Sequence, residues 1–139
     1  MKKYSLSEIE TMTGYTSRSL RKFMAEGLLK GELVGRKWTF TEEQLNKFLT
    51  NGNVREGLKI KNGIIAKQFL EDFAENRACV IYNVRPSEEL VAGITDKIRG
   101  MKTDIQFSYF CDEKTGIGRF ILAGDVNAIG EITSLFKEM

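Results

Sequence analysis

The sequence predicts an α+β fold with three parts in chain order: a small N-terminal unit, a connector helix and a C-terminal β-α-β-β-α module. Residues 1–52 hold two helical patterns separated by a glycine, then two strand-like runs and a third helical pattern. Hydrophobic residues at helical spacing mark the connector within residues 53–77. Residues 78–139 alternate strand-like runs with two more helical patterns, which predicts a second α+β unit.

The composition is that of a globular protein, since 42% of the 139 residues are hydrophobic and 29% are charged. No apolar stretch approaches the roughly twenty residues of a membrane helix, and the N-terminus lacks a signal-peptide core. We therefore expect a cytoplasmic protein without membrane contact. The absence of histidine excludes His-based triads and His-ligated metal sites. Cys79 and Cys111 are too few for a disulfide framework and lack metal-ligand spacing.

The charge is unevenly distributed along the chain. Residues 1–52 contain nine Lys or Arg and six Asp or Glu, whereas residues 78–139 contain seven and nine. The basic N-terminal end is therefore the expected partner of phosphates, and the acidic C-terminal end would repel them.

Capping signals predict two short helices at the start of the chain. Ser5 and Glu8 have the spacing of a capping box, and Gly14 stops the helix that follows. Thr16 is the expected N-cap of the second helix, which runs to about Ala25 before Gly27 ends it.

The second helix has two distinct faces. Its inward side carries Leu20, Phe23 and Met24, and its outward side carries Ser17, Arg18, Arg21 and Lys22. That layout is typical of a helix-turn-helix whose second helix enters a DNA groove. The alternative is that these basic residues are simply the solvated face of a surface helix.

A hairpin and a third helix complete the N-terminal unit. The strand-like runs 28–34 and 37–40 flank the short turn Gly35-Arg36, which predicts a wing with Arg36 and Lys37 at its tip. Residues 41–44 form a second capping box and open a helix that ends at Asn51-Gly52. Residues 1–52 thus have the order of a winged helix-turn-helix. Trp38 is expected to pack the wing onto the helices.

Residues 4–49 resemble the winged DNA-binding domain shared by the MerR regulators and the phage excisionase group. The matching positions are Tyr4 to Ile9, Thr13-Gly14, Ser19 to Lys22, Glu26 to Leu29 and Arg36 to Leu45. MerR proteins usually have an aromatic pair after the helix-two arginine, but here Lys22-Phe23 follows, which is closer to the excisionase side. The resemblance implies binding to double-stranded DNA. The expected contact residues are Thr16, Ser17, Arg18, Arg21, Lys22, Arg36 and Lys37.

The connector is predicted to be helical from Gly63 onward, because apolar residues recur at helical spacing up to Phe73. Residues 53–57 and Asn62 are poor helix interior. A helix of about sixteen residues would be about 24 Å long. That is shorter than the antiparallel coiled coil that MerR dimers generally use.

The C-terminal pattern predicts a ferredoxin-like module without its last strand. Strands are expected at 78–84, 105–111 and 119–123, with a hairpin loop at 112–116. Pro86-Ser87 opens one helix and Asp125 caps another, whose apolar positions extend to Phe136.

Both faces of the first of these strands are apolar, so something must cover the sheet face that the two helices leave bare. Val80, Tyr82 and Val84 lie on one face, and Cys79 and Ile81 on the other. The connector helix, a second subunit or both could provide the cover. We expect a homodimer, with a monomer covered by the connector as the alternative. A small-molecule effector bound at the dimer seam is expected only by analogy with other sensor domains of this size.

The sequence predicts no enzyme, cofactor or metal site, since no nucleophile, base and orienting group come together. Asp112, Glu113 and Lys114 fit a solvated hairpin loop. Gly116-Ile117-Gly118 lies between strands rather than before a helix, which is a weak phosphate-loop signal. The two cysteines would form a redox switch only if their strands were adjacent.

Three functions are compatible with this organisation. The favoured one is a sequence-specific transcription regulator, whose DNA-binding head is joined to a dimerisation or effector domain at residues 78–139. An excisionase-like architectural factor for site-specific recombination is the alternative, although such factors are usually little more than the winged domain. The third is an enzyme that carries a DNA-binding head.

Overall fold

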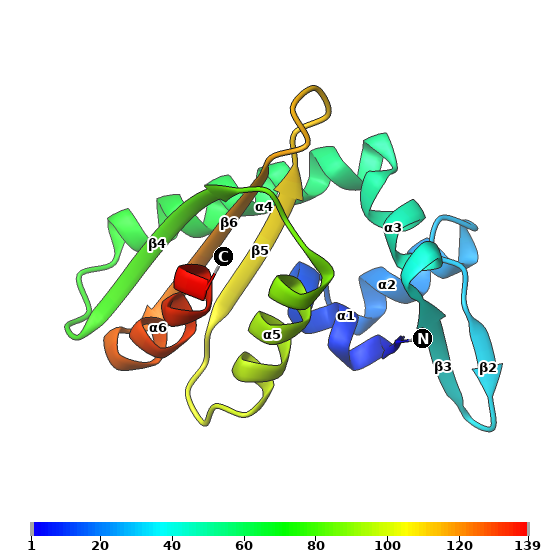
Figure 1. Ribbon diagram of the computed structural model, residues 1–139, viewed down its shortest axis with the longest axis horizontal. Helices are drawn as coiled ribbons and strands as arrows, with labels where there is room; N and C mark the ends of the chain where they lie inside the picture. The colour runs from blue at the N-terminus through cyan, green and yellow to red at the C-terminus, as the bar shows by residue number, and fades with distance from the viewer. Residues whose placement is uncertain (1, 139) are drawn as a thin grey trace.

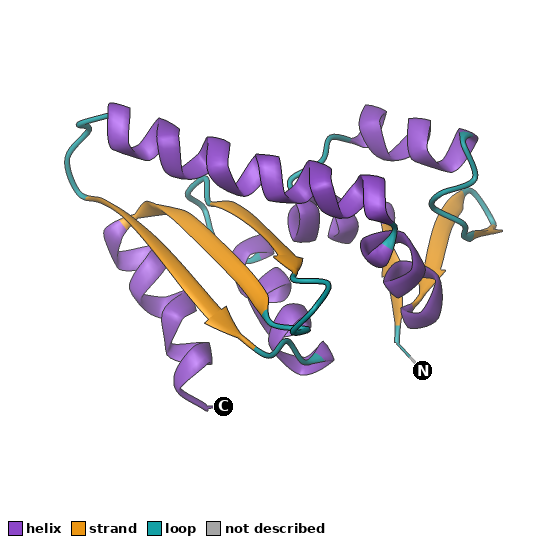
Figure 2. Cartoon of the chain, turned by 90° about the horizontal axis from the view of Figure 1, so that it is seen from above, coloured by secondary structure: helices purple, strands orange, loops and turns teal. Residues whose placement is uncertain are grey.

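The computed structural model describes residues 2–138, which form an α+β fold with six α-helices and two three-stranded antiparallel sheets (Figure 1). One sheet belongs to the N-terminal unit, residues 3–50, and the other to the C-terminal module, residues 77–138. A long helix between them crosses the C-terminal sheet (Figure 2).

The N-terminal unit contains three helices and a small sheet. Its elements are β1 (Lys3–Ser5), α1 (Leu6–Thr13), α2 (Ser17–Ala25), β2 (Glu32–Val34), β3 (Lys37–Thr41) and α3 (Glu42–Thr50). The side chains of Ser5, Thr16 and Thr41 accept hydrogen bonds from the first-turn amides of α1, α2 and α3, so the three predicted N-caps are confirmed. The sequence did not predict β1, which has only three residues and pairs with β3.

The first hairpin strand is shorter than predicted. It begins at Glu32 rather than Leu28, because the amides of Leu28 and Leu29 donate to the carbonyl oxygen of Phe23 and complete the end of α2. Leu29 is thereby turned into the core, where it is 1% exposed. Trp38 is half-buried and packs against that core, as expected.

Helix α4 (Gly52–Glu71) is longer than the predicted connector and begins directly after α3. Asn51 caps it, with its side-chain oxygen accepting from the amides of Asn53 and Val54. The helix has 20 residues, or about 30 Å. Val54 and Leu58 are buried in the core, which outweighs the unfavourable helix propensity of the glycines within α4. Phe73 lies beyond the end of the helix, so its place on the helical stripe was wrongly predicted.

The C-terminal module has the predicted β-α-β-β-α order. Its elements are β4 (Arg77–Val84), α5 (Glu88–Arg99), β5 (Gln106–Cys111), β6 (Gly118–Asp125) and α6 (Val126–Thr133), followed by the 3-10 turn η1 (Ser134–Glu138). The strands are ordered β4-β6-β5. Helices α5 and α6 lie on one side of this sheet and α4 on the other (Figure 2). Phe136, predicted to lie on the last helix, is buried from η1 instead.

One hydrophobic core runs through both parts of the molecule. Ile9 and Met12 of α1 belong to the same buried cluster as Phe107 of β5 and Ile94 of α5. Outside that core, the Arg99 guanidinium donates to the Ser7 hydroxyl at 2.6 Å. Helix α1 is therefore packed directly against the β5 edge of the C-terminal sheet and against α5.

The second face of the C-terminal sheet is only partly covered. Ile65 of α4 packs on Ile121 and Ala123 of β6, so the connector does cover the middle of the sheet. Ile81 on the neighbouring strand β4 stays 54% exposed, and Leu70 near the end of α4 is 74% exposed. An apolar strip is left open beside β4.

Candidate nucleic-acid interface

An aromatic cluster fixes the orientation of α2. Leu20 is fully buried, and the ring of Phe23 lies 5.1 Å from that of Tyr15 and 5.3 Å from that of Phe48, measured between centroids. Both contacts are edge-on, the arrangement that aromatic pairs favour. Because these apolar residues face inward, the basic residues of α2 are directed outward.

The outward face of α2 carries Arg18, Arg21 and Lys22, all exposed. Within residues 2–138 none of the three forms an ion pair with a carboxylate. Nε of Arg21 donates to Oγ of Ser17 at 3.4 Å, a long contact that leaves the rest of the guanidinium free of intramolecular hydrogen bonds. These cations are available to an external anion.

Thr16 has a different role from the other predicted contact residues. Its hydroxyl oxygen accepts from the amide of Ser19 at 3.1 Å, and the hydroxyl donates to Oγ of Ser19 at the same distance. Thr16 therefore caps α2, and its hydroxyl is already engaged within the chain.

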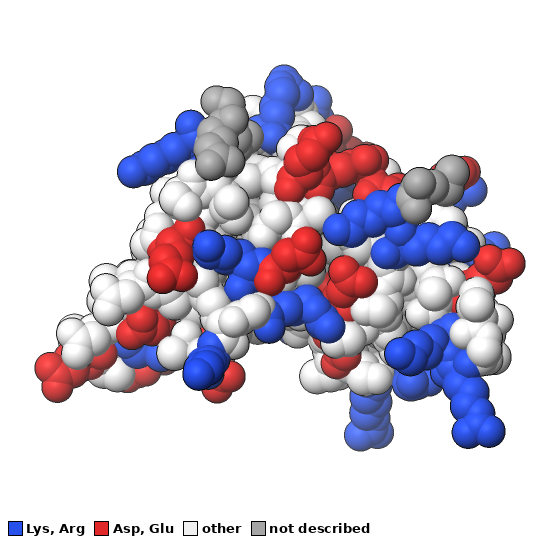
Figure 3. Space-filling view, turned by 60° about the horizontal axis from the view of Figure 1, so that its bottom comes forward, with Lys and Arg blue, Asp and Glu red and all other residues white. Residues whose placement is uncertain are grey.

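The hairpin β2–β3 carries the other two predicted residues. Gly35 occupies the left-handed region with φ 65°, which permits the tight turn, and Val34 pairs with Lys37 across it. Arg36 and Lys37 are both exposed at this tip. Helix α2 and the hairpin lie at the same end of the molecule (Figure 1). Lys and Arg side chains project from that end, whereas acidic and basic residues are mixed over the middle of the same face (Figure 3).

The hairpin loop that follows β5 is held by its own residues. Oδ2 of Asp112 accepts from the amide and the hydroxyl of Thr115 at 2.9 and 2.8 Å, and these bonds lower the pKa of the carboxyl. Glu113 lies 3.9 Å from the Arg55 guanidinium. The acidic side chains of this loop thus have structural partners.

The two cysteines cannot form the redox pair that adjacent strands would have allowed. Strand β6 lies between β4 and β5, and Cys79 is opposite Ala123 on it while Cys111 is opposite Gly118. The thiols are therefore separated by a whole strand and by five positions along it. Burial raises the pKa of both thiols, which also disfavours the reactive thiolate.

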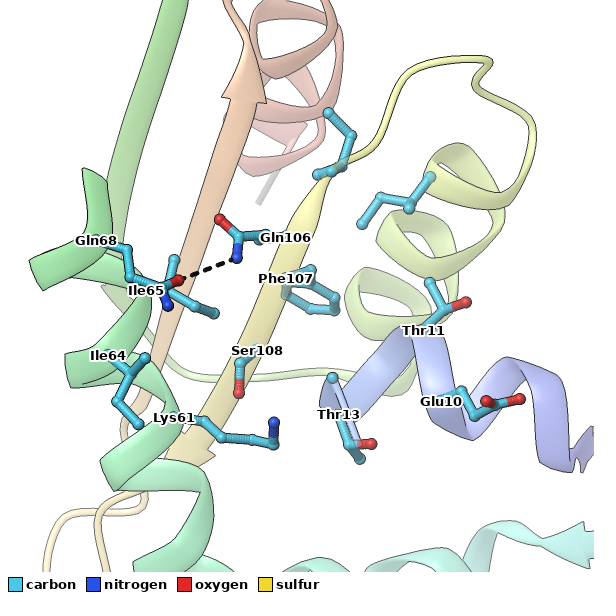
Figure 4. Close-up of a pocket in the computed structure, with 13 residues that line it drawn as sticks. Glu10, Thr11, Thr13, Lys61, Ile64, Ile65, Gln68, Gln106, Phe107 and Ser108 are labelled. Atoms are coloured by element: carbon cyan, nitrogen blue, oxygen red, sulfur yellow. Dashed lines mark hydrogen bonds between the residues drawn. The ribbon is translucent and has the colours of Figure 1, made fainter. Parts of the chain in front are cut away.

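Two cavities lie between the N-terminal unit and the C-terminal module, and the sequence predicted neither. The first, about 450 Å³, is bounded by α1, α4, α5 and β5. Figure 4 shows Lys61, Ile64 and Gln68 of α4 on one side of it and Glu10 and Thr11 of α1 on the other, with Gln106 hydrogen-bonded to Gln68 at 3.5 Å.

The second cavity, about 230 Å³, lies near the far end of β5. Its polar lining residues include Tyr4, Glu42, Glu88 and Tyr109. They come from β1, α3, α5 and β5, so no local motif could have indicated that they meet.

No family model, curated protein or solved structure matches the chain. A function can therefore be argued only from the residues of the site. Between residues 2 and 138, no helix is long and apolar enough to cross a membrane. The same residues contain no group of three or more His, Cys, Asp or Glu side chains that could hold a metal ion.

Proposed function

We propose that the N-terminal unit is a winged helix-turn-helix and that the protein is a sequence-specific DNA-binding transcription regulator. The observation that carries the proposal is the outward face of α2, where Arg18, Arg21 and Lys22 are exposed and unpaired with any carboxylate of the described chain. The hairpin β2–β3 lies at the same end of the molecule as α2 (Figure 1), and its tip adds the exposed Arg36 and Lys37.

In this proposal the residues of α2 and of the wing have different roles. Arg18 and Ser17 lie in the first turn of α2, the part of a recognition helix that reaches base edges in the major groove. An arginine there can donate two hydrogen bonds to one guanine, which distinguishes base pairs. Lys37 on the wing supplies a point charge to phosphates, which strengthens binding without reading sequence.

The C-terminal module supports a regulator over an excisionase-like architectural factor. Factors of that group are usually little more than the winged domain, whereas this chain continues into a second sheet covered by two helices of its own. We propose that the module holds two copies together at the open edge of β4, so that two recognition helices meet a palindromic operator.

The DNA prediction is tested with a site selected from random duplexes and measured by fluorescence anisotropy at several salt concentrations. Arg18→Ala should weaken binding to that site by about 1–3 kcal/mol and reduce the preference for it over other duplexes. Lys37→Ala should weaken binding to all duplexes alike and flatten the salt dependence.

Lys102→Ala is the matched control, because it removes one exposed positive charge from a loop of the C-terminal module. It should change neither the affinity nor the sequence preference. The proposal would be contradicted if the three single variants Arg18→Ala, Arg21→Ala and Arg36→Ala all kept the DNA affinity of the unmodified protein at moderate salt.

A further inference from the structure

The smaller of the two cavities is lined by both apolar and polar residues. Its apolar lining residues include Leu45 and Leu49 of α3, Leu58 of α4, Pro86 just before α5 and Val91 within α5. We call this cavity, of about 230 Å³ between the N-terminal unit and the C-terminal module, the seam pocket.

Two carboxyl groups, those of Glu42 and Glu88, line the seam pocket. Oε1 of Glu42 accepts from the Tyr4 hydroxyl at 2.5 Å. The side chain of Glu88, in the first turn of α5, is within hydrogen-bonding reach of Glu42, which raises the pKa of Glu88. One carboxyl comes from each part of the molecule, and their like charges oppose one another when both are ionised.

No cation of the described chain neutralises this pair. Neither Glu42 nor Glu88 forms an ion pair with a Lys or Arg among residues 2–138. The ammonium group of Lys2 lies 5.4 Å from the centre of the Tyr4 ring, but its carboxylate partner is Asp96, at 4.0 Å. The seam pocket therefore has an excess of negative charge.

Tyr109 contributes a hydroxyl to the lining of the seam pocket. Its side chain lines the pocket and is only 8% exposed, yet its hydroxyl makes no hydrogen bond within the described part of the chain. Burial raises the pKa of this phenol, and neighbouring Cys111, Tyr4 and Glu42 add to the effect, so the hydroxyl stays neutral. The oxygen of this hydroxyl can therefore accept a hydrogen bond from a group bound in the pocket.

We propose that the seam pocket binds a small organic cation, an amine with an apolar body. The ammonium group would lie between Glu42 and Glu88 and donate a hydrogen bond to the Tyr109 oxygen, while the leucine side chains hold the apolar body.

This inference goes beyond the proposed DNA-binding function and does not depend on it. It is tested on the full chain without DNA, by isothermal titration calorimetry with benzylammonium chloride at neutral pH. Benzyl alcohol, which has the same apolar body without the charge, is the matched neutral probe. Benzylammonium should bind at one site per chain, and benzyl alcohol should give no saturable binding.

Charge-neutral variants locate the binding group. Glu42→Gln should weaken benzylammonium binding by about tenfold, because the Glu42 carboxylate is half-buried. Glu88→Gln should weaken it by about threefold, because Glu88 is exposed and solvent screens its charge. The controls are the neighbours Glu89→Gln and Glu43→Gln, two exposed acids outside the pocket lining, which should stay within about twofold of the unmodified protein. Tyr109→Phe, which removes only the hydroxyl, should also weaken binding.

A measurement on the unmodified protein keeps the test independent of how the variants fold. Amide chemical shifts followed during the titration should change most around Glu88 and Tyr109. The proposal is overturned if the unmodified protein does not bind benzylammonium at millimolar concentration. It is also overturned if benzyl alcohol binds equally well, if Glu88→Gln binds as tightly as Glu89→Gln, or if the shift changes lie on α2.

Discussion

Gly14 is the residue at which the turn between α1 and α2 touches the C-terminal module. It ends α1 in the left-handed conformation, with φ 77° and its amide donating to the Glu10 carbonyl oxygen at 2.8 Å. A Cβ atom at this position would lie 3.2 Å from the backbone oxygen of Phe107 in β5. The glycine is therefore required by its own conformation and by the close approach of another strand.

Gly14→Ala should destabilise the fold more than Gly27→Ala does. Gly27 has nearly the same backbone conformation, φ 79°, but a Cβ there would meet no atom within 4 Å. Both variants should lose about 1 kcal/mol or more to backbone strain, and only Gly14→Ala also disturbs the contact with β5. Urea unfolding measures the difference. Equal losses would mean that the approach to Phe107 adds no cost.

For single residues, the sequence predicts those that interact with near neighbours in the chain. It misses those that interact with residues distant in the sequence. Ser5, Thr16 and Thr41 were predicted as caps because a cap is defined by the few residues that follow it. Glu88 and Tyr109 carry no local signal, because their chemistry arises only where α5 and β5 meet the N-terminal unit. The basic residues of α2 that the DNA-binding proposal needs could likewise be predicted from the local sequence pattern.

Among the elements, α4 departs most from its prediction. Its first half contains Gly57 and polar residues that disfavour a helix, and the predicted start was therefore at Gly63. The structure extends the helix back to Gly52, since Val54 and Leu58 become buried only when that segment is helical and packed on the rest of the protein. Burial of this kind depends on partners that are distant in sequence.

The two glycines within α4 should respond differently to alanine. A Cβ at Gly63 would meet no atom within 4 Å, so Gly63→Ala should raise the free energy of unfolding by about 0.5–1 kcal/mol through helix propensity alone. A Cβ at Gly57 would lie 2.6 Å from the Tyr15 hydroxyl oxygen. Gly57→Ala should therefore gain less than Gly63→Ala or lose stability.

Urea unfolding of the two variants compares them within one helix. A stabilisation of Gly57→Ala as large as that of Gly63→Ala would show that Tyr15 moves aside without cost. If neither variant differed from the unmodified protein, helix propensity would not limit the stability of α4.

At the scale of the whole molecule, the main surface without a partner is the free edge of the C-terminal sheet, along β4. Strand β4 pairs with β6 on one side, and no strand of the described chain pairs with its other side. Strand β4 has eight residues, and those backbone donors and acceptors that face its free edge are a template for another strand. Ile81, Leu70 and Phe73 are exposed beside it, and Phe73 is 92% exposed. The β5 edge differs, because α1 packs against it.

A two-fold axis at Val80 would satisfy this edge with a second copy of the chain. Antiparallel pairing about that residue sets Cys79 opposite Ile81 of the second copy and joins the two sheets into one of six strands. The arrangement also leaves α2 and the hairpin free, since both lie at the other end of the molecule (Figure 1).

We therefore expect a homodimer by multi-angle light scattering at concentrations on the order of tens of micromolar. Ile81→Asp should shift the protein to a monomer, because two charges would be buried close together at the axis. Leu33→Asp on the hairpin is the matched control, since Leu33 is 55% exposed and Ile81 54%, and it should remain dimeric. The two-fold arrangement would be ruled out if the unmodified protein were a monomer and still bound a palindromic site tightly. If the Ile81→Asp variant stayed dimeric, the interface would lie elsewhere than β4.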